Sequence, residues 1–149
     1  MTKILMLLMF LVLVAAVTAA EPASPVLKLE LPTGQTVVVA EGELEARSIG
    51  SFSVRLYQAA ATPDETTFFL SGIIRPRDGV LENVVVADVV GDDQPEIIVI
   101  SRSVGTGSYQ SAYVFEFTEN TLRFRTQLDG LAADEDPIAA LRTSTARGN

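Results

Sequence analysis

The chain contains no cysteine and no histidine among its 149 residues. Without histidine it has no imidazole base for a serine–histidine triad, and without cysteine it has no thiol nucleophile. Zinc centres built from these two residue types are excluded for the same reason. Disulfides are excluded as well, so packing alone has to stabilise the fold. What remains for function is the chemistry of carboxylates, hydroxyls, lysine and arginine, and no cofactor is expected.

Basic residues are scarce. The chain has 11 lysines and arginines against 19 aspartates and glutamates, for a formal net charge of −8. Nucleic acid and anionic membranes are themselves negative, so neither is an expected partner. The acidity aids solubility, and it also suits a protein partner with a basic surface.

A hydrophobic run occupies the N-terminal region. Ile4 to Val17 is unbroken and apolar, Lys3 precedes it, and the small residues 18–20 follow it. This pattern predicts a signal peptide over residues 1–20, cleaved after Ala20, with cleavage after Ala19 as the alternative. A membrane anchor needs roughly 20 apolar residues, which the run does not reach. Since no cysteine is available for lipidation, we expect a soluble exported domain over residues 21–149.

Most of the following segments favour strands. Phe52, Val54 and Leu56 alternate with more polar neighbours, which is the period-two pattern of a half-buried strand. The most apolar runs, 83–88 and 97–100, are expected at the centre of a sheet. About eight such runs at close spacing predict an all-β fold, an antiparallel sandwich with a barrel as the alternative.

A turn and a short helix are predicted in addition to the strands. Residues 76–79 (Pro-Arg-Asp-Gly) predict an exposed turn whose cations pair with nearby acids. Near the C-terminus, Asp136 followed by Pro137 predicts the start of a short helix that reaches Arg142. Residues 143–149 are expected to be frayed.

A polar loop, 101–109, separates the strand-like runs 96–100 and 113–117. Gly105 and Gly107 allow backbone conformations that other residues avoid. Ser103, Thr106 and Ser108 of the loop carry hydroxyl groups, and Tyr109 is its one aromatic residue. Such a loop can enter a partner's cleft and form hydrogen bonds there. An ordinary polar connection between strands is the alternative.

Acidic residues suggest two further possibilities. Residues 88–96 resemble the calcium loops of integrin-type propeller repeats, with Asp88, Asp92 and Glu96 at positions 1, 5 and 9. Position 3 is Val90, which cannot ligate, and calcium prefers six to eight oxygens. These acids are therefore weak metal candidates, and a tight acidic turn is the alternative. Glu96 and Glu116 could instead form a hydrolytic carboxylate pair or be solvated strand ends.

Several stretches together resemble a known family, the periplasmic inhibitors of invertebrate-type (i-type) lysozyme. The resemblance covers much of the predicted domain and rests on residues 46–57, 74–79, 88–100 and 101–113. It implies an antiparallel β-sandwich in the periplasm that binds i-type lysozyme and catalyses no reaction. It also implies homodimers.

The family's S-G-x-Y motif supplies a serine and a tyrosine that enter the lysozyme active site. In this chain the resemblance assigns these roles to Thr106 and Tyr109, with Gly107 and Ser108 between them. Thr106 departs from the family serine, because its hydroxyl comes with an extra methyl group and a stiffer χ1. The second hypothesis is an exported module that binds calcium or carbohydrate through Asp88, Asp92 and Glu96.

Overall fold

The structure is a computed structural model that describes residues 24–62, 66 and 68–148. The predicted signal peptide, 1–20, and its cleavage site lie outside the described residues, so the boundary at residue 21 stays a prediction. No helix in the described part of the chain is both long and apolar enough to cross a bilayer.

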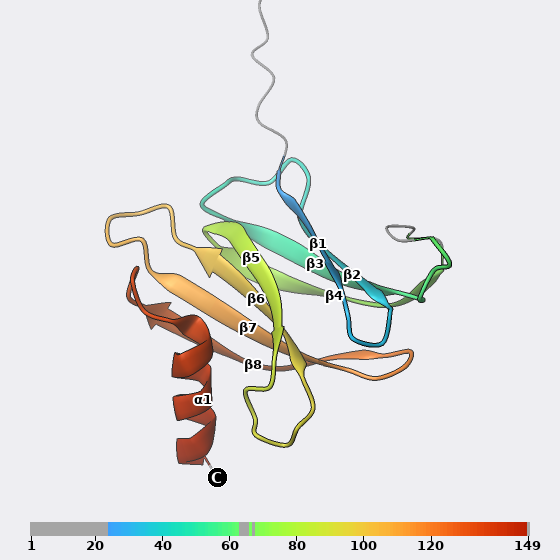
Figure 1. Ribbon diagram of the computed structural model, residues 1–149. Coiled ribbons are helices and arrows are strands. Elements are labelled where there is room, and N and C mark those ends of the chain that lie inside the picture. Colours follow the sequence, from blue (N-terminus) through green and yellow to red (C-terminus); the bar gives the residue numbers. More distant parts are fainter. Residues whose placement is uncertain (1–23, 63–65, 67, 149) are drawn as a thin grey trace, which may run out of the picture.

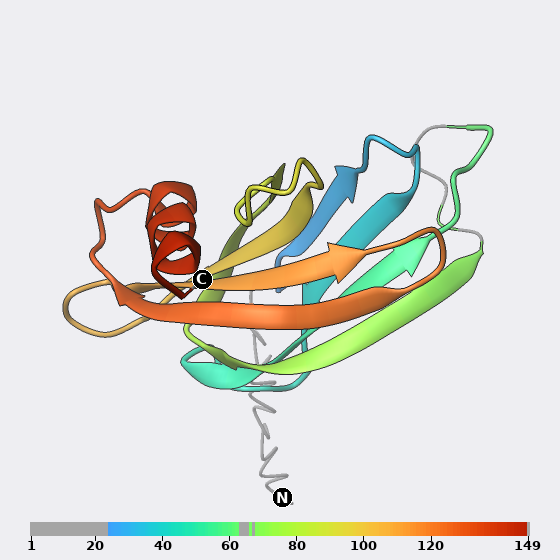
Figure 2. The same cartoon turned by 90° about the horizontal axis from the view of Figure 1, so that it is seen from below.

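Eight strands form two antiparallel four-stranded sheets, each with its strands in chain order. The first sheet contains β1 (Val26–Glu30), β2 (Thr36–Glu41), β3 (Ile49–Tyr57) and β4 (Phe69–Asp78). The second contains β5 (Val80–Ala87), β6 (Glu96–Arg102), β7 (Gln110–Phe117) and β8 (Leu122–Leu131), followed by the helix α1 (Pro137–Gly148). The sheets lie as two layers (Figures 1 and 2). This confirms the predicted sandwich, and the barrel alternative is wrong because the two sheets do not join into a closed ladder.

The main core lies between the two sheets. Phe52, Val54 and Leu56 of β3 are fully buried there, as their alternation predicts. The ring of Phe52 meets Tyr113 and Phe115 of β7 edge-on, with ring centroids 4.9 and 6.2 Å away. These aromatic contacts join the middle of one sheet to the middle of the other.

A second core lies between the other face of the second sheet and α1 (Figure 2). Ile98 and Ile100 of β6 face this core together with Leu141 of the helix, while Ile97 and Val99 face the main core. Strand β6 is therefore buried on both faces, which explains its unbroken apolar run.

The expectation that both apolar runs lie at a sheet centre is correct for β6 and wrong for β5. The order β5-β6-β7-β8 makes β5 an edge strand. It is apolar because both of its faces are covered. Val84 packs in the main core, and Val85 packs against the core beneath α1.

The helix begins as predicted and ends later. The Asp136 carboxylate accepts a hydrogen bond from the backbone N–H of Ile138 at 2.9 Å, which is the N-cap arrangement. The predicted fraying from Thr143 is wrong, since α1 continues to Gly148. The Thr143 and Thr145 hydroxyls donate to backbone carbonyls one turn earlier, and buried Leu141 holds this part of the helix on the sheet.

Because every strand pair is antiparallel, the loops fall at two opposite ends of the sandwich. The β2–β3 loop (42–48), the β4–β5 junction at Gly79 and the β6–β7 loop (103–109) share one end, at the left of Figure 1. The β5–β6 loop (88–95) lies at the other end. The two candidate sites are thus at opposite ends of the molecule.

Candidate functional site

The β6–β7 loop, residues 103–109, projects beyond the end of its sheet (Figure 1). The predicted start of the loop at Ser101 is wrong, because Ser101 and Arg102 belong to β6 and Ser101 is fully buried. A backbone hydrogen bond from Ser103 N to Tyr109 O, 2.8 Å long, closes its base. Gly107 and Ser108 turn the chain with φ angles of 108° and 47°. A Cβ atom at position 107 would lie 2.6 Å from Cε2 of Tyr109. Glycine at 107 therefore lets the tyrosine ring lie against the turn.

The loop exposes the residues that the motif singles out. Tyr109 is 54% exposed although it directly precedes a buried strand position. Thr106, Gly105 and Gly107 are exposed at the tip, whereas Ser103 and Ser108 are half-buried. The structure thus gathers all six predicted loop residues in one projecting hairpin, with an aromatic ring and a hydroxyl at its surface.

Arg102, which precedes the loop, braces it from the side. Its Nη1 donates to the backbone carbonyls of Ser108 at 3.0 Å and Ala133 at 3.2 Å. Its Nε donates to the Glu82 carboxylate at 2.9 Å. One guanidinium group therefore ties the loop to edge strand β5 and to the segment before α1. The sequence pattern did not single out this residue.

Gln110 holds the other side of the loop base. It is buried, and its side-chain amide donates to the carbonyls of Ala132, Ala133 and Glu135 at 3.0, 3.3 and 3.1 Å. A loop held on both sides before binding loses less conformational entropy when it binds. The bracing therefore favours a role in recognition.

The predicted exposed turn at 76–79 is wrong. Residues up to Asp78 belong to β4, and Arg77 is only 2% exposed. Its guanidinium donates to the carbonyls of Ala46, Arg47, Ser51 and Gly79 and lies 3.6 Å from the Glu41 carboxylate. Burial of arginine is possible here because carbonyls and a carboxylate surround it. Glu41, which lies far away in the sequence, gave no local signal of this pairing.

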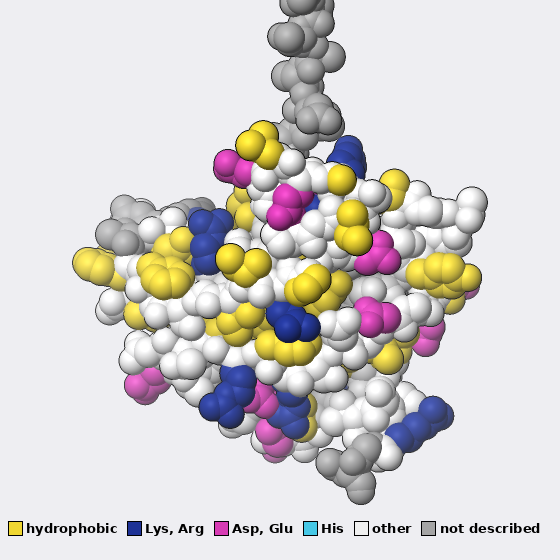
Figure 3. Space-filling view, turned by 180° about the vertical axis from the view of Figure 1, so that it is seen from behind, with side chains coloured by type: hydrophobic (Ala, Val, Ile, Leu, Met, Phe, Trp, Pro, Cys, Tyr) yellow, Lys and Arg dark blue, Asp and Glu magenta, His cyan; other side chains and the backbone are white. Residues whose placement is uncertain are grey.

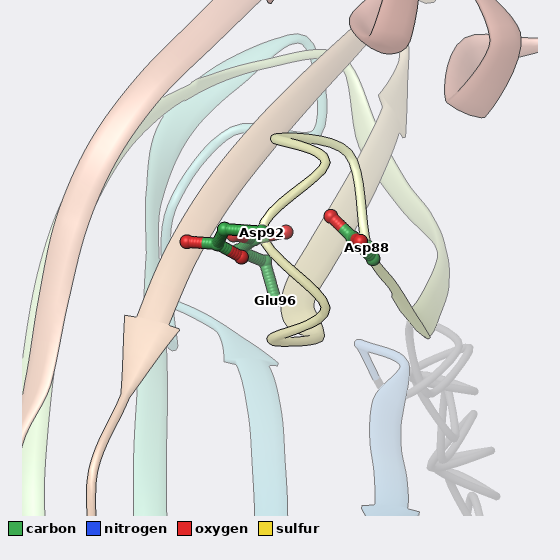
Figure 4. A group of neighbouring side chains, drawn as sticks. All are labelled: Asp88, Asp92 and Glu96. Atoms are coloured by element: carbon green, nitrogen blue, oxygen red, sulfur yellow. The ribbon is translucent and has the colours of Figure 1, made fainter.

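The acidic residues of the opposite end do come together (Figure 4). Carboxylate oxygens of Asp88, Asp92 and Glu96 lie within 4.8 Å of one another. The Asp88 carboxylate accepts hydrogen bonds from the backbone N–H groups of Val90, Gly91 and Asp93 at 3.1, 2.6 and 3.1 Å. These bonds, that from Gly91 above all, lower the pKa of Asp88.

Glu96 is buried, contrary to the expectation of a solvated strand end. Its Oε2 accepts the backbone N–H of Val89 at 3.0 Å. Burial raises the pKa of its carboxyl, and neighbouring Asp92 and Asp88 add to the rise. The cluster thus has the contacts of an acidic turn whose carboxylates hold the loop backbone. Val90 at position 3 supplies no side-chain oxygen for a cation.

The other carboxylate of the suggested hydrolytic pair is engaged elsewhere. Glu116 on β7 is half-buried and forms an ion pair with Arg125 on β8. Glu96 is directed to the β5–β6 loop instead, through Val89. Both glutamates therefore make contacts that stabilise the fold, and neither contact indicates a hydrolytic role.

Comparison with known proteins shows that most of the described fold is similar to one family. The family model that describes a periplasmic lysozyme inhibitor of I-type lysozyme matches residues 23–145. A crystal structure of such an inhibitor, PliI-Ah of Aeromonas hydrophila, is 42% identical with a TM-score of 0.71, and the match covers 79% of this chain and 99% of that one.

A second structure shows Aeromonas hydrophila PliI in complex with Meretrix lusoria lysozyme. It is 41% identical with a TM-score of 0.72, and the match covers 80% of this chain and 96% of that one. A comparison with curated proteins found no match.

Proposed function

Given that the chain belongs to the family of periplasmic inhibitors of I-type lysozyme, we propose that it blocks its target by inserting the 103–109 loop into the active-site cleft. It is a periplasmic protein that binds I-type lysozyme, and it is an inhibitor rather than an enzyme. The observation that carries the loop assignment is the exposed Tyr109 ring on a braced hairpin.

The chemistry of the loop suits a lysozyme cleft. Lysozymes work with two carboxyl groups, one of them protonated as the general acid. A hydroxyl can donate to an ionised carboxylate and accept from a protonated one, so the Thr106 and Tyr109 hydroxyls match either state. The tyrosine ring adds rigid apolar area beside its polar tip, which is typical of an interface anchor. Inhibition then follows from occupancy alone.

Thr106 stands at the family's serine position. It lies exposed at the loop tip, where its extra methyl group meets solvent in this chain. Whether that methyl is accommodated is therefore decided by the shape of the target's cleft. We expect Thr106→Ser to keep inhibition and to change the preference between I-type lysozymes.

The test is a cell-wall clearing assay with the chain expressed in full, purified from the periplasm and added to I-type, chicken-type and goose-type lysozymes. We expect selective inhibition of the I-type enzyme. Tyr109→Ala should raise the inhibition constant by roughly 30-fold, which corresponds to a hot spot of ~2 kcal/mol. Tyr109→Phe separates the contribution of the hydroxyl from that of the ring.

Phe68→Ala is the matched control, because Phe68 is 66% exposed and lies at the opposite end of the sandwich. An inhibition constant that Tyr109→Ala leaves unchanged in a folded protein would overturn the insertion of this loop.

A further inference from the structure

Exposed apolar side chains gather at the end of the sandwich that carries the 103–109 loop. Besides Val104 and Tyr109 of the loop itself, Val26, Leu44 and Ile49 belong to this end, and all are more than half exposed. On the back of the molecule, hydrophobic side chains form separate groups with charged ones between them (Figure 3).

Leu44, in the β2–β3 loop, is the most unusual of these residues. It is fully exposed and has a φ angle of 63°. A bulky residue other than glycine rarely adopts this left-handed conformation, and such strain tends to occur where function requires it. The loop around Leu44 is well held, since the Glu45 carboxylate accepts hydrogen bonds from the backbone N–H and the hydroxyl of Ser51. The fold thus presents a strained leucine to solvent without burying it.

Buried Arg77 connects this loop to the 103–109 loop. Its Nη1 and Nη2 bind the Arg47 and Ala46 carbonyls at 2.9 and 3.2 Å, and Nη1 also binds the Gly79 carbonyl. Gly79 has a φ angle of 80°, and a Cβ atom there would lie 2.0 Å from the carbonyl oxygen of Arg102. The β4–β5 junction therefore packs against the base of the 103–109 loop. The two loops are held in one fixed arrangement through this junction.

An open groove of about 860 Å³ lies between them. Ile49 lines it from the first sheet and Tyr109 from the 103–109 loop, with Pro76 and Ser111 along its walls. Ile49 therefore lines the same groove as the tyrosine that is proposed to enter the lysozyme cleft.

We propose that the β2–β3 loop together with the first residue of β3, through Leu44 and Ile49, is a second contact element that binds I-type lysozyme beside the cleft into which the 103–109 loop inserts. The proposal rests on the proposed function, because both elements bind the same enzyme. A stable interface takes about 20–30 residues from each side, which is more than the 103–109 loop supplies. A second apolar element at a fixed distance provides the missing area.

The experiment measures the inhibition constant and the dissociation rate of the complex for Leu44→Ser and Ile49→Ser. Each change should raise the inhibition constant by roughly fivefold to tenfold, mainly through faster dissociation. Ile74→Ser is the matched control, since Ile74 is 73% exposed against 68% for Ile49 and lies in the middle of β4. It should inhibit like the unaltered protein.

Leu44→Gly provides a second, independent readout. Glycine accepts the left-handed backbone without strain, so the melting temperature should be kept or raised while inhibition weakens. A residue with a purely structural role would not show this combination.

Unchanged inhibition by Leu44→Ser and Ile49→Ser overturns the second contact, and if Tyr109→Ala still weakens inhibition, the proposed function stands without it. If Tyr109→Ala is also without effect, the insertion of the 103–109 loop fails separately.

Discussion

Arg77 and Glu41 form an ion pair in the interior of the protein, 3.6 Å apart, with side chains only 1% and 4% exposed. The second oxygen of Glu41 accepts the backbone N–H of Leu81 at 2.7 Å. The pair therefore joins β2 of the first sheet to β4 and to the start of β5 in the second. Burying two charges is tolerated because backbone groups complete their hydrogen bonding.

Arg77→Met should destabilise the fold by about 3–5 kcal/mol, because it leaves the Glu41 carboxylate buried without its cation. Adding Glu41→Gln removes the buried charge, so the double variant should be more stable than Arg77→Met alone. Chemical denaturation of the three proteins measures both effects. A single variant as stable as the unaltered protein would contradict this account of the pair.

Arg102→Met should weaken inhibition more than it weakens the fold. The change removes the bonds to Ser108, Ala133 and Glu82 that brace the 103–109 loop. We expect a roughly fivefold to tenfold higher inhibition constant, about 1 kcal/mol, from the added cost of ordering the loop on binding. Melting temperature and inhibition are measured together, with Arg123→Met, an exposed arginine at the other end, as the control. Equal inhibition by both variants would argue against preorganisation by Arg102.

Glu96 should make stability depend on pH. Its folded-state pKa is raised, first by burial, so the folded protein holds this proton more tightly than the unfolded chain does. The stabilisation is complete below the ordinary glutamate pKa of 4.5 and is lost as the pH rises through the folded-state pKa. Glu96→Gln keeps an acceptor for Val89 N–H without the buried charge. It should therefore melt above the unaltered protein at pH 7, and the gap should shrink on acidification.

Thermal melts from pH 7 down to pH 4.5 measure this gap. Glu119→Gln, at an exposed position in the β7–β8 turn, is the control. A gap that widens as the pH falls would contradict the assignment.

Calcium should leave the melting temperature unchanged. A ligand that binds only the folded state raises the melting point, but the Asp88 and Glu96 carboxylates already accept backbone N–H groups, and Val90 offers no ligand. Melts in millimolar calcium and in chelator measure the effect. A rise of several degrees in calcium, lost in Asp88→Asn, would revive the calcium-binding hypothesis.

The sequence by itself determined the features that depend on local patterns. Alternation in β3 predicts which residues face the core, Asp136 and Pro137 predict the start of α1, and the glycines at 105 and 107 predict the projecting loop. Each of these follows from the preferences of a few consecutive residues. The resemblance to the family rests on several such stretches, 46–57, 74–79, 88–100 and 101–113, each of which is a run of neighbouring residues.

Only the tertiary structure decided the features that depend on contacts between distant residues. The apolar run of β5 looks like a central strand, yet β5 is an edge strand covered by a helix more than 50 residues later. Arg77 looks like a turn residue and is buried, because Glu41 and the carbonyls of the β2–β3 loop meet it there. Burial and ion pairing are properties of surroundings assembled from separate strands. For that reason the sequence alone could predict the 103–109 loop. It could not predict that the β2–β3 loop is held at the same end of the sandwich.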